Sequence, residues 1–244
     1  MAKGYLYDDQ MALFGARQVV GFGSEAFHVR QIHRDLANEI IIRNHYSGRV
    51  YNGTTIHLGL VIGGELRGVL QFGYAMNPAS QDSVVAGTKL DEYLELNRMW
   101  LDDAAPKNSE SQALPYAIRF IRRTWPRIKW IQSFADERCG LFGTVYQAAN
   151  FHYCGEHVTR FYELDGESYH PSLLHRGAGA GPRGEYLRRN IARATARDLR
   201  QFRYIFFLKA GVEKGLRHKI QPYPKPDYAV GRLDEPGPPG AREA

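Results

Sequence analysis

Two side chains that can exchange protons, a carboxylate and a phenol, lie close together in the sequence. An apolar run that starts at Trp130 ends in the carboxylate of Asp136. Gly143 opens the next segment, in which Tyr146 and Asn150 are four residues apart and would share one face of a helix. Open α/β sheets bind ligands at such strand-to-helix junctions, where an acid and a phenol can accept and donate protons. The pattern therefore predicts a reaction centre here.

Each of these residues also has a structural interpretation. Asp136 could be a general base, a metal ligand or an N-terminal helix cap. Tyr146 could be a proton donor or a buried tyrosine with a hydrogen-bonded hydroxyl. Asn150 could orient a substrate group or cap the C-terminus of its helix. The residues alone leave these alternatives open.

A second pair, His45 and Tyr46, follows a predicted helix over residues 31–43, where apolar residues recur at helical spacing. In one interpretation the pair faces a ligand, and His45 moves protons near neutral pH or binds a metal. In the other, His45 is a cation that stabilises the helix C-terminus and Tyr46 packs as an anchor.

The surrounding elements alternate between strands and helices. Two β-rich runs, residues 55–62 and 66–75, are joined by Gly63-Gly64, which is typical of a tight hairpin. Further strands are expected over 93–100 and 128–135, with helices after Asn108 and Gly143 and an antiparallel pair around Asp165-Gly166. This order predicts an α/β fold with a mixed central sheet flanked by helices.

The helix after Asn108 carries two local signals. Ser109 and Gln112 have the spacing of a capping box. Pro115 lacks a backbone N–H and predicts either a position in the first turn or a bend.

The C-terminal region is basic. Between Arg183 and Lys225 there are 12 Lys or Arg residues and three acids. Several arginines recur at helical spacing, which predicts a basic helical C-terminal extension over residues 185–202. Such a stripe could be a solvated helix face, but the shortage of acids favours contacts with nucleic-acid phosphates. The candidate residues are Arg188, Arg189, Arg193, Arg197, Arg200, Lys219 and Lys225.

Composition sets wider bounds. The chain has 244 residues, 43% of them hydrophobic, enough for one sizeable core. Its net charge of +6 permits an anionic partner. Its two cysteines form no CxxC motif, so neither a zinc site nor a disulfide framework is indicated. Without a signal-peptide pattern or membrane-spanning run, we expect a cytoplasmic protein that does not bind membranes. The sequence indicates no oligomeric state.

Five separated blocks carry a family resemblance. They are His45-Tyr46, Glu95 to Trp100, Asn108 to Ser111, Ser133 to Tyr153, and a Pro-Tyr-Pro-Lys element at residues 222–225. Over most of residues 30–225 the chain resembles the bacteriophage Mom-type DNA modification proteins, an offshoot of the GNAT acyltransferase fold. We expect an N-terminal segment over 1–30 and, from the resemblance, a catalytic core over 31–175. A basic helix and terminal strand over 176–228 would complete the fold, and a C-terminal composition rich in Gly, Pro and Glu predicts a disordered tail over 229–244.

The implied activity is attachment of a carbamoylmethyl (acetamido-type) group to the exocyclic N6 amine of adenine in double-stranded DNA. Such a mark blocks restriction nucleases that read the adenine edge. Because that amine is paired within the duplex, base extrusion is an expected step. The family also implies that His45 and Tyr46 take part in activity, and that the bacterial host cytoplasm is where the protein acts.

The resemblance also implies a small-molecule donor. Arg98, Asn108, Ser109 and Ser111, with Asn150, are the candidate donor-binding residues, and Tyr146 would protonate the thiolate of coenzyme A. The glycine-rich loop of most GNAT proteins is missing here. Acetyl-CoA would also leave a carbonyl on the adenine nitrogen, whereas the family product has a methylene. The donor is therefore acetyl-CoA or another acyl or aminoacyl compound, or else iron assists, with His45 and Asp136 as ligands.

Two other function classes remain open. A conventional GNAT N-acetyltransferase acting on a protein, a tRNA or a small amine would need Tyr146 but not the basic segment. A catalytically inert DNA-binding protein would need the basic segment but neither Asp136 nor Tyr146.

Overall fold

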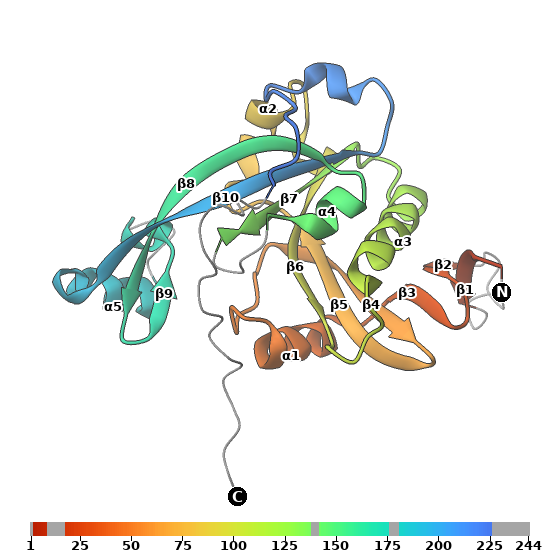
Figure 1. The fold of residues 1–244 in the computed structure, drawn as a ribbon, viewed down its shortest axis with the longest axis horizontal. Coiled ribbons are helices and arrows are strands. Elements are labelled where there is room, and N and C mark those ends of the chain that lie inside the picture. The colour runs from red at the N-terminus through yellow and green to blue at the C-terminus, as the bar shows by residue number, and fades with distance from the viewer. Residues whose placement is uncertain (1, 9–17, 138–141, 176–180, 226–244) are drawn as a thin grey trace, which may run out of the picture.

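The computed structural model describes residues 2–8, 18–137, 142–175 and 181–225. Its centre is a sheet of ten strands in the order β1-β2-β3-β4-β5-β6-β7-β10-β8-β9 (Figure 1). The strands are β1 (Gly4–Asp8), β2 (Gln18–Gly23), β3 (Phe27–Gln31), β4 (Thr54–Ile62), β5 (Glu65–Gly73), β6 (Tyr93–Leu101), β7 (Trp130–Asp136), β8 (His152–Leu164), β9 (Glu167–Tyr169) and β10 (Thr195–Phe207). The helices are α1 (Arg34–Asn44), α2 (Gln81–Val84), α3 (Ser109–Thr124), α4 (Thr144–Ala148) and α5 (Pro182–Arg189). The expected mixed sheet flanked by helices is confirmed.

The parallel pair β6–β7 is open at one end. The strands pair at Tyr93 with Trp130, Leu94 with Ile131, and Glu95 with Gln132, and then separate. Beyond that point β6 continues along β5, and β7 continues along β10. We call this opening the splay. It faces the carboxyl ends of two parallel strands, where open α/β sheets bind ligands.

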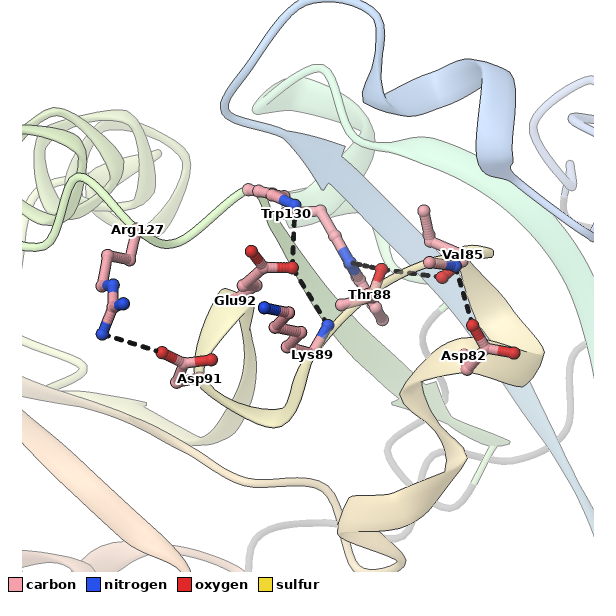
Figure 2. A network of polar contacts seen from close by, with 10 residues as sticks. Asp82, Val85, Thr88, Lys89, Asp91, Glu92, Arg127 and Trp130 are labelled. Atoms are coloured by element: carbon pink, nitrogen blue, oxygen red, sulfur yellow. Dashed lines mark hydrogen bonds and ion pairs between the residues drawn. The ribbon is translucent and has the colours of Figure 1, made fainter.

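A polar network fixes the closed end of the splay (Figure 2). The indole Nε1 of Trp130 donates to Thr88 Oγ1 at 3.1 Å, and that hydroxyl donates to the carbonyl of Val85 at 2.7 Å. Glu92 accepts from Lys129 Nζ at 2.8 Å, which joins the starts of β6 and β7. Because these bonds tie both strands to one loop, the strands can diverge only at their carboxyl ends.

The two faces of the sheet are covered differently. Helix α3 and the short α4 pack on one face, where the largest cluster of buried apolar side chains lies. On the other face α1 covers Val69 with Ala37 and Ile41, and the region of α2 covers Trp130. Between these two covers the α1-side face carries a polar strip, which we define as Glu95, Gln132, Phe134, Asp136 and Arg203. Strand alternation and cross-strand register place these residues on one face.

Strands β8 and β10 extend beyond the rest of the sheet as a two-stranded arm, residues 158–175 and 181–200, that ends in β9 and α5 (Figure 1). A small apolar cluster of Leu164, Tyr169 and Leu187 holds the tip together. The tip also contacts the body, since Arg49 Nη2 lies 2.8 Å from Glu167 Oε2.

Several local expectations are confirmed. The Gly63-Gly64 hairpin, the strand over 93–100 and the turn at Asp165-Gly166 all form. Among the residues that the structure describes, no helix is long and apolar enough to cross a membrane.

Other expectations are wrong. The basic helix over 185–202 is replaced by α5, a 3-10 turn and the start of β10, so no continuous helical stripe exists. The expected boundary at residue 30 falls inside β3, whose pairing with β4 makes the N-terminal strands part of the same sheet. Pro115 lies inside α3, which excludes the first-turn alternative and leaves a bend as the remaining prediction. The expected tail over 229–244 lies outside the described residues.

Candidate functional site

The C-terminal ends of β6 and β7 lead into the helices that carry the expected donor residues. Helix α3 starts at Ser109, and α4 starts at Thr144. Both helices pack on the same face of the sheet, and each follows one of the two strands that form the splay.

The first turn of α3 differs from the predicted capping box. Asn108 is the N-cap, in the left-handed region at φ 68°, and its side chain makes no cap hydrogen bond. Ser109 Oγ donates to the carbonyl of Pro106 at 2.6 Å, and Ser111 Oγ donates to the carbonyl of Asn108 at 2.9 Å. The turn is therefore fixed by hydroxyl-to-carbonyl bonds, and no side chain of the predicted box covers its backbone N–H groups.

The acids of the loop before α3 are less of an obstacle to an anionic donor than the sequence indicates. Asp102 pairs with Arg67 Nη1 at 2.9 Å and accepts from the backbone N–H of Ala104 at 2.9 Å. The backbone N–H of Ala104 and then the guanidinium of Arg67 lower the pKa of Asp102, so its charge is balanced by a residue of β5.

Tyr146 is held by aromatic side chains on the α3 side of the sheet. Its ring lies 5.7 Å from that of Phe151 and 5.3 Å from that of Tyr204. Gln147 Nε2 donates to Tyr204 Oη at 3.0 Å, and burial raises the pKa of Tyr204 to about 12. Tyr204 therefore stays neutral and positions α4, while Tyr146 is half-buried beside it.

Asn150 does not share a helix face with Tyr146, because α4 ends at Ala148. Asn150 takes the left-handed conformation at φ 63°. Its N–H bonds to the carbonyl of Gln147 at 3.0 Å, and the N–H of Phe151 bonds to that of Tyr146 at 3.0 Å. These two bonds form a Schellman motif, so Asn150 ends the helix.

Asp136 lies on the opposite face from Tyr146. It is buried as the last residue of β7 and pairs across the strands with Gln201. Strand alternation directs its side chain to the polar strip, whereas Tyr146 packs against the core under α3. The structure therefore places the expected acid and phenol on two sides of the sheet.

His45 and Tyr46 lie at the end of α1, on the α1-side face. His45 is the C-cap, and its Nδ1 accepts from the backbone N–H of Ser47 at 3.1 Å. This assigns the proton of the neutral ring to Nε2. Burial, followed by the charge of Arg98, lowers the pKa of His45 to about 4. The ring is therefore neutral near pH 7, which does not fit a cation that stabilises the helix end.

Tyr46 is exposed and its ring packs at a tilt against this imidazole, with ring centroids 4.2 Å apart. Arg98 belongs to the same group, because its partner on β5 is Gln71 and not a residue of the α3 side. Its Nε donates to the carbonyl of Arg49 at 3.2 Å. Of the expected donor residues, Arg98 is thus grouped with His45, apart from the start of α3.

Glu95 is a site residue that the sequence reasoning did not single out. It lies where β6 and β7 separate, and its Oε2 accepts from Gln132 Nε2 at 2.8 Å. Burial raises the pKa of its carboxyl to about 7, despite the hydrogen bonds from Gln132 and Asn97. Its position as an acid inside an otherwise mainly apolar strand start, Tyr93 to Leu96, was the available signal.

Comparison with known proteins now identifies the family. The Mom protein family model matches residues 26–225. A curated relative, the methylcarbamoylase Mom of Escherichia phage Mu, is 50% identical over 211 residues, covering 85% of this chain and 88% of that protein. The chain belongs to the Mom protein family.

Solved structures with similar folds have much lower sequence identity to this chain than the curated relative has. The ribosomal-protein-S5-alanine acetyltransferase of Vibrio fischeri has 12% identity and a TM-score of 0.47, covering 78% of this chain and 98% of its own. An N-acetyltransferase of Staphylococcus aureus has 16% identity and a TM-score of 0.42, with coverages of 74% and 98%. Likenesses at this level carry no weight for function.

Four of the candidate basic residues of this Mom-family chain are paired with acids. The distances are 2.5 Å for Arg189–Glu185, 2.6 Å for Arg193–Asp165, 3.1 Å for Arg197–Glu163 and 2.9 Å for Arg200–Glu137. Arg188 donates to the carbonyl of Leu173 at 2.8 Å, while Lys219 and Lys225 are exposed. The local shortage of acids is thus offset in part by Asp165, Glu163 and Glu137, which lie outside the basic segment.

The expected iron site gains no support from side-chain grouping. In the described part of the chain, no three His, Cys, Asp or Glu residues are grouped so as to hold a metal ion. His45 and Asp136 therefore lack a third protein ligand of these types there, and we derive no step through a metal.

Proposed function

We propose that this protein transfers a carbamoylmethyl group to the exocyclic N6 amine of adenine in double-stranded DNA, in the cytoplasm of a bacterial host. The observation that carries this proposal is the 50% identity, over 85% of the chain, with a relative named methylcarbamoylase. The DNA target rests on the family resemblance.

The arrangement of the two faces supports a division of roles. The adenine approaches the α1-side face, where Asp136, His45 and Tyr46 lie. The donor binds on the other face, along the first turns of α3 and α4, using Asn108, Ser109 and Ser111. The splay between β6 and β7 is where the two would meet. Asp136 and Tyr146 then act on opposite partners, which accounts for their separation.

In this proposal the N6 lone pair of adenine bonds to the methylene carbon of an activated acetamide donor. The bond from that carbon to the leaving group breaks, and the leaving group takes the electron pair. Asp136 accepts the proton lost from N6, and Tyr146 donates one to the leaving group. The neutral His45 can donate a hydrogen bond from Nε2, and Tyr46 can stack on the extruded base.

Coenzyme A as carrier of the donor fits the start of α3 only in part. The backbone N–H groups at a helix start suit a phosphate, and the balanced charge of Asp102 removes one objection. When bound, coenzyme A would supply a thiolate leaving group. The methylene in the product requires an acetamide donor and not a simple acetyl group.

Restriction resistance tests the proposal. Plasmid from cells that express the wild-type protein should resist nucleases whose sites contain adenine. Asp136→Asn and Tyr146→Phe should abolish the resistance without loss of soluble protein. Arg127→Gln, a change at an exposed arginine paired with Asp91 near the closed end of the splay, should leave resistance intact. Full cleavage of plasmid from the wild-type strain would contradict the proposal.

A further inference from the structure

Arg203 is a half-buried cation at the middle of the polar strip. Its Nη1 donates to Gln132 Oε1 at 3.0 Å, and its guanidinium lies over the ring of Phe134 at 4.8 Å. Among the described residues it forms no ion pair, although Arg197 and Arg200 on the same strand both do. Burying a charge without an opposite charge costs free energy.

Gln132 explains why Arg203 forms no ion pair with Glu95. This buried amide accepts from Arg203 through Oε1 and donates to Glu95 through Nε2 at 2.8 Å. It therefore bridges the guanidinium and the nearest carboxyl of the strip and keeps them from pairing directly. Glu95 opposes an anion only weakly, because burial favours its neutral form. Asp136, two residues from Phe134, remains the other acid on the strip.

We propose that Arg203, oriented by Gln132 and Phe134, is an anion-binding residue whose ligand is a phosphate group, supplied by the DNA backbone or by the group donor. A planar guanidinium suits this ligand, since it can make two parallel hydrogen bonds to phosphate oxygens. The two possible sources of the phosphate rest on the proposed function, whereas the anion site itself does not.

Two imidazoles near Arg203 can report on such an anion. His157 packs edge-on against Phe134, with ring centroids 5.5 Å apart. The pKa values of His157 and His218 are both lowered, first by burial and then by the charge of Arg203. A bound phosphate would offset that charge and raise both pKa values.

The test is a histidine NMR titration of the full chain with and without inorganic phosphate. Phosphate should raise the pKa of His157 and His218 in the wild type. In Arg203→Gln both values should start higher and should not respond to phosphate, while Arg127→Gln should behave as the wild type. If phosphate moves neither histidine in the wild type, the anion site is overturned, whether or not any variant folds.

Two binding titrations identify the source of the phosphate. If it belongs to DNA, Arg203→Gln should weaken duplex binding and lower the log-log salt slope by roughly 0.9 relative to Arg127→Gln. If it belongs to the donor, the duplex slope should stay the same while affinity for pyrophosphate falls. Unchanged binding of both probes would overturn the proposal.

Arg203→Lys provides a second variant in case Arg203→Gln is unstable. Because it keeps the charge but loses the planar fork, it should retain only part of the phosphate response. The two proposals can fail separately. If cellular DNA contains no modified adenine but phosphate binding still depends on Arg203, the proposed function is wrong and the anion site is supported.

Discussion

At the scale of single residues, burial rather than residue type decides how the titratable groups can act. His45 has the residue type of a general base, yet its lowered pKa of about 4 makes it a weak one at neutral pH. With Nδ1 occupied by Ser47, its Nε2–H becomes the useful group. His45→Gln keeps a donor amide and should retain more modification activity than His45→Ala, whereas equal losses would contradict this role.

The same residue should make the protein sensitive to acid. The unfolded chain takes up a proton at His45 below pH 6.5, whereas the folded protein does so only near pH 4. Stability from this group is therefore complete above pH 6.5 and is lost as the pH falls toward 4. Urea unfolding at pH 7 and pH 5 should show the wild type losing on the order of 2 kcal/mol more than His45→Gln. Equal losses would show that the imidazole is not buried as described.

At the scale of elements, α4 depends on close packing at its N-cap residue, Gly143. Gly143 has φ 76°, and a Cβ there would lie 2.3 Å from the ring of Tyr204. Gly143→Ala should therefore displace Tyr146, lower stability by about 2–4 kcal/mol and remove activity. Gly63→Ala is a matched control, because φ is 59° but nothing lies within 4 Å, so only backbone strain of about 1–2 kcal/mol is expected. Equal effects in thermal melts would contradict the packing role.

The arm carries the arginines that the sequence predicts to contact DNA phosphates, and this prediction can be tested by substitution. Arg189, Arg193 and Arg197 are exposed but paired with acids, so reversing their charge would disrupt the arm itself. Neutral Gln substitutions avoid this. If the arginines also contact phosphates, the triple variant should bind all duplexes more weakly, with the salt slope reduced by roughly 0.9 for each lost contact. Identical slopes for wild type and variant would exclude the arm as a DNA contact.

At the scale of the whole molecule, sequence patterns of neighbouring residues predicted several helices, strands and turns. The arrangement of the site depends on contacts between residues far apart in the sequence, which such patterns do not predict. Gly63-Gly64 and Asp165-Gly166 each specify a turn through their own backbone, so both hairpins could be predicted. Arg197 and Arg200 have helical spacing but lie on β10, because pairing with β8 overrides that local pattern. The partner of Glu95 is Gln132, 37 residues away on another strand, and no local pattern indicates it.

The central claim is that adenine in DNA acquires a carbamoylmethyl group through residues on both faces of the sheet. Mass spectrometry of nucleosides from DNA of expressing cells tests it most directly. We expect a heavier deoxyadenosine whose added mass matches one carbamoylmethyl group in place of a hydrogen. This nucleoside should be absent with Asp136→Asn or Tyr146→Phe and present with Arg127→Gln. Only unmodified deoxyadenosine in cells rich in the soluble wild-type protein would contradict the account.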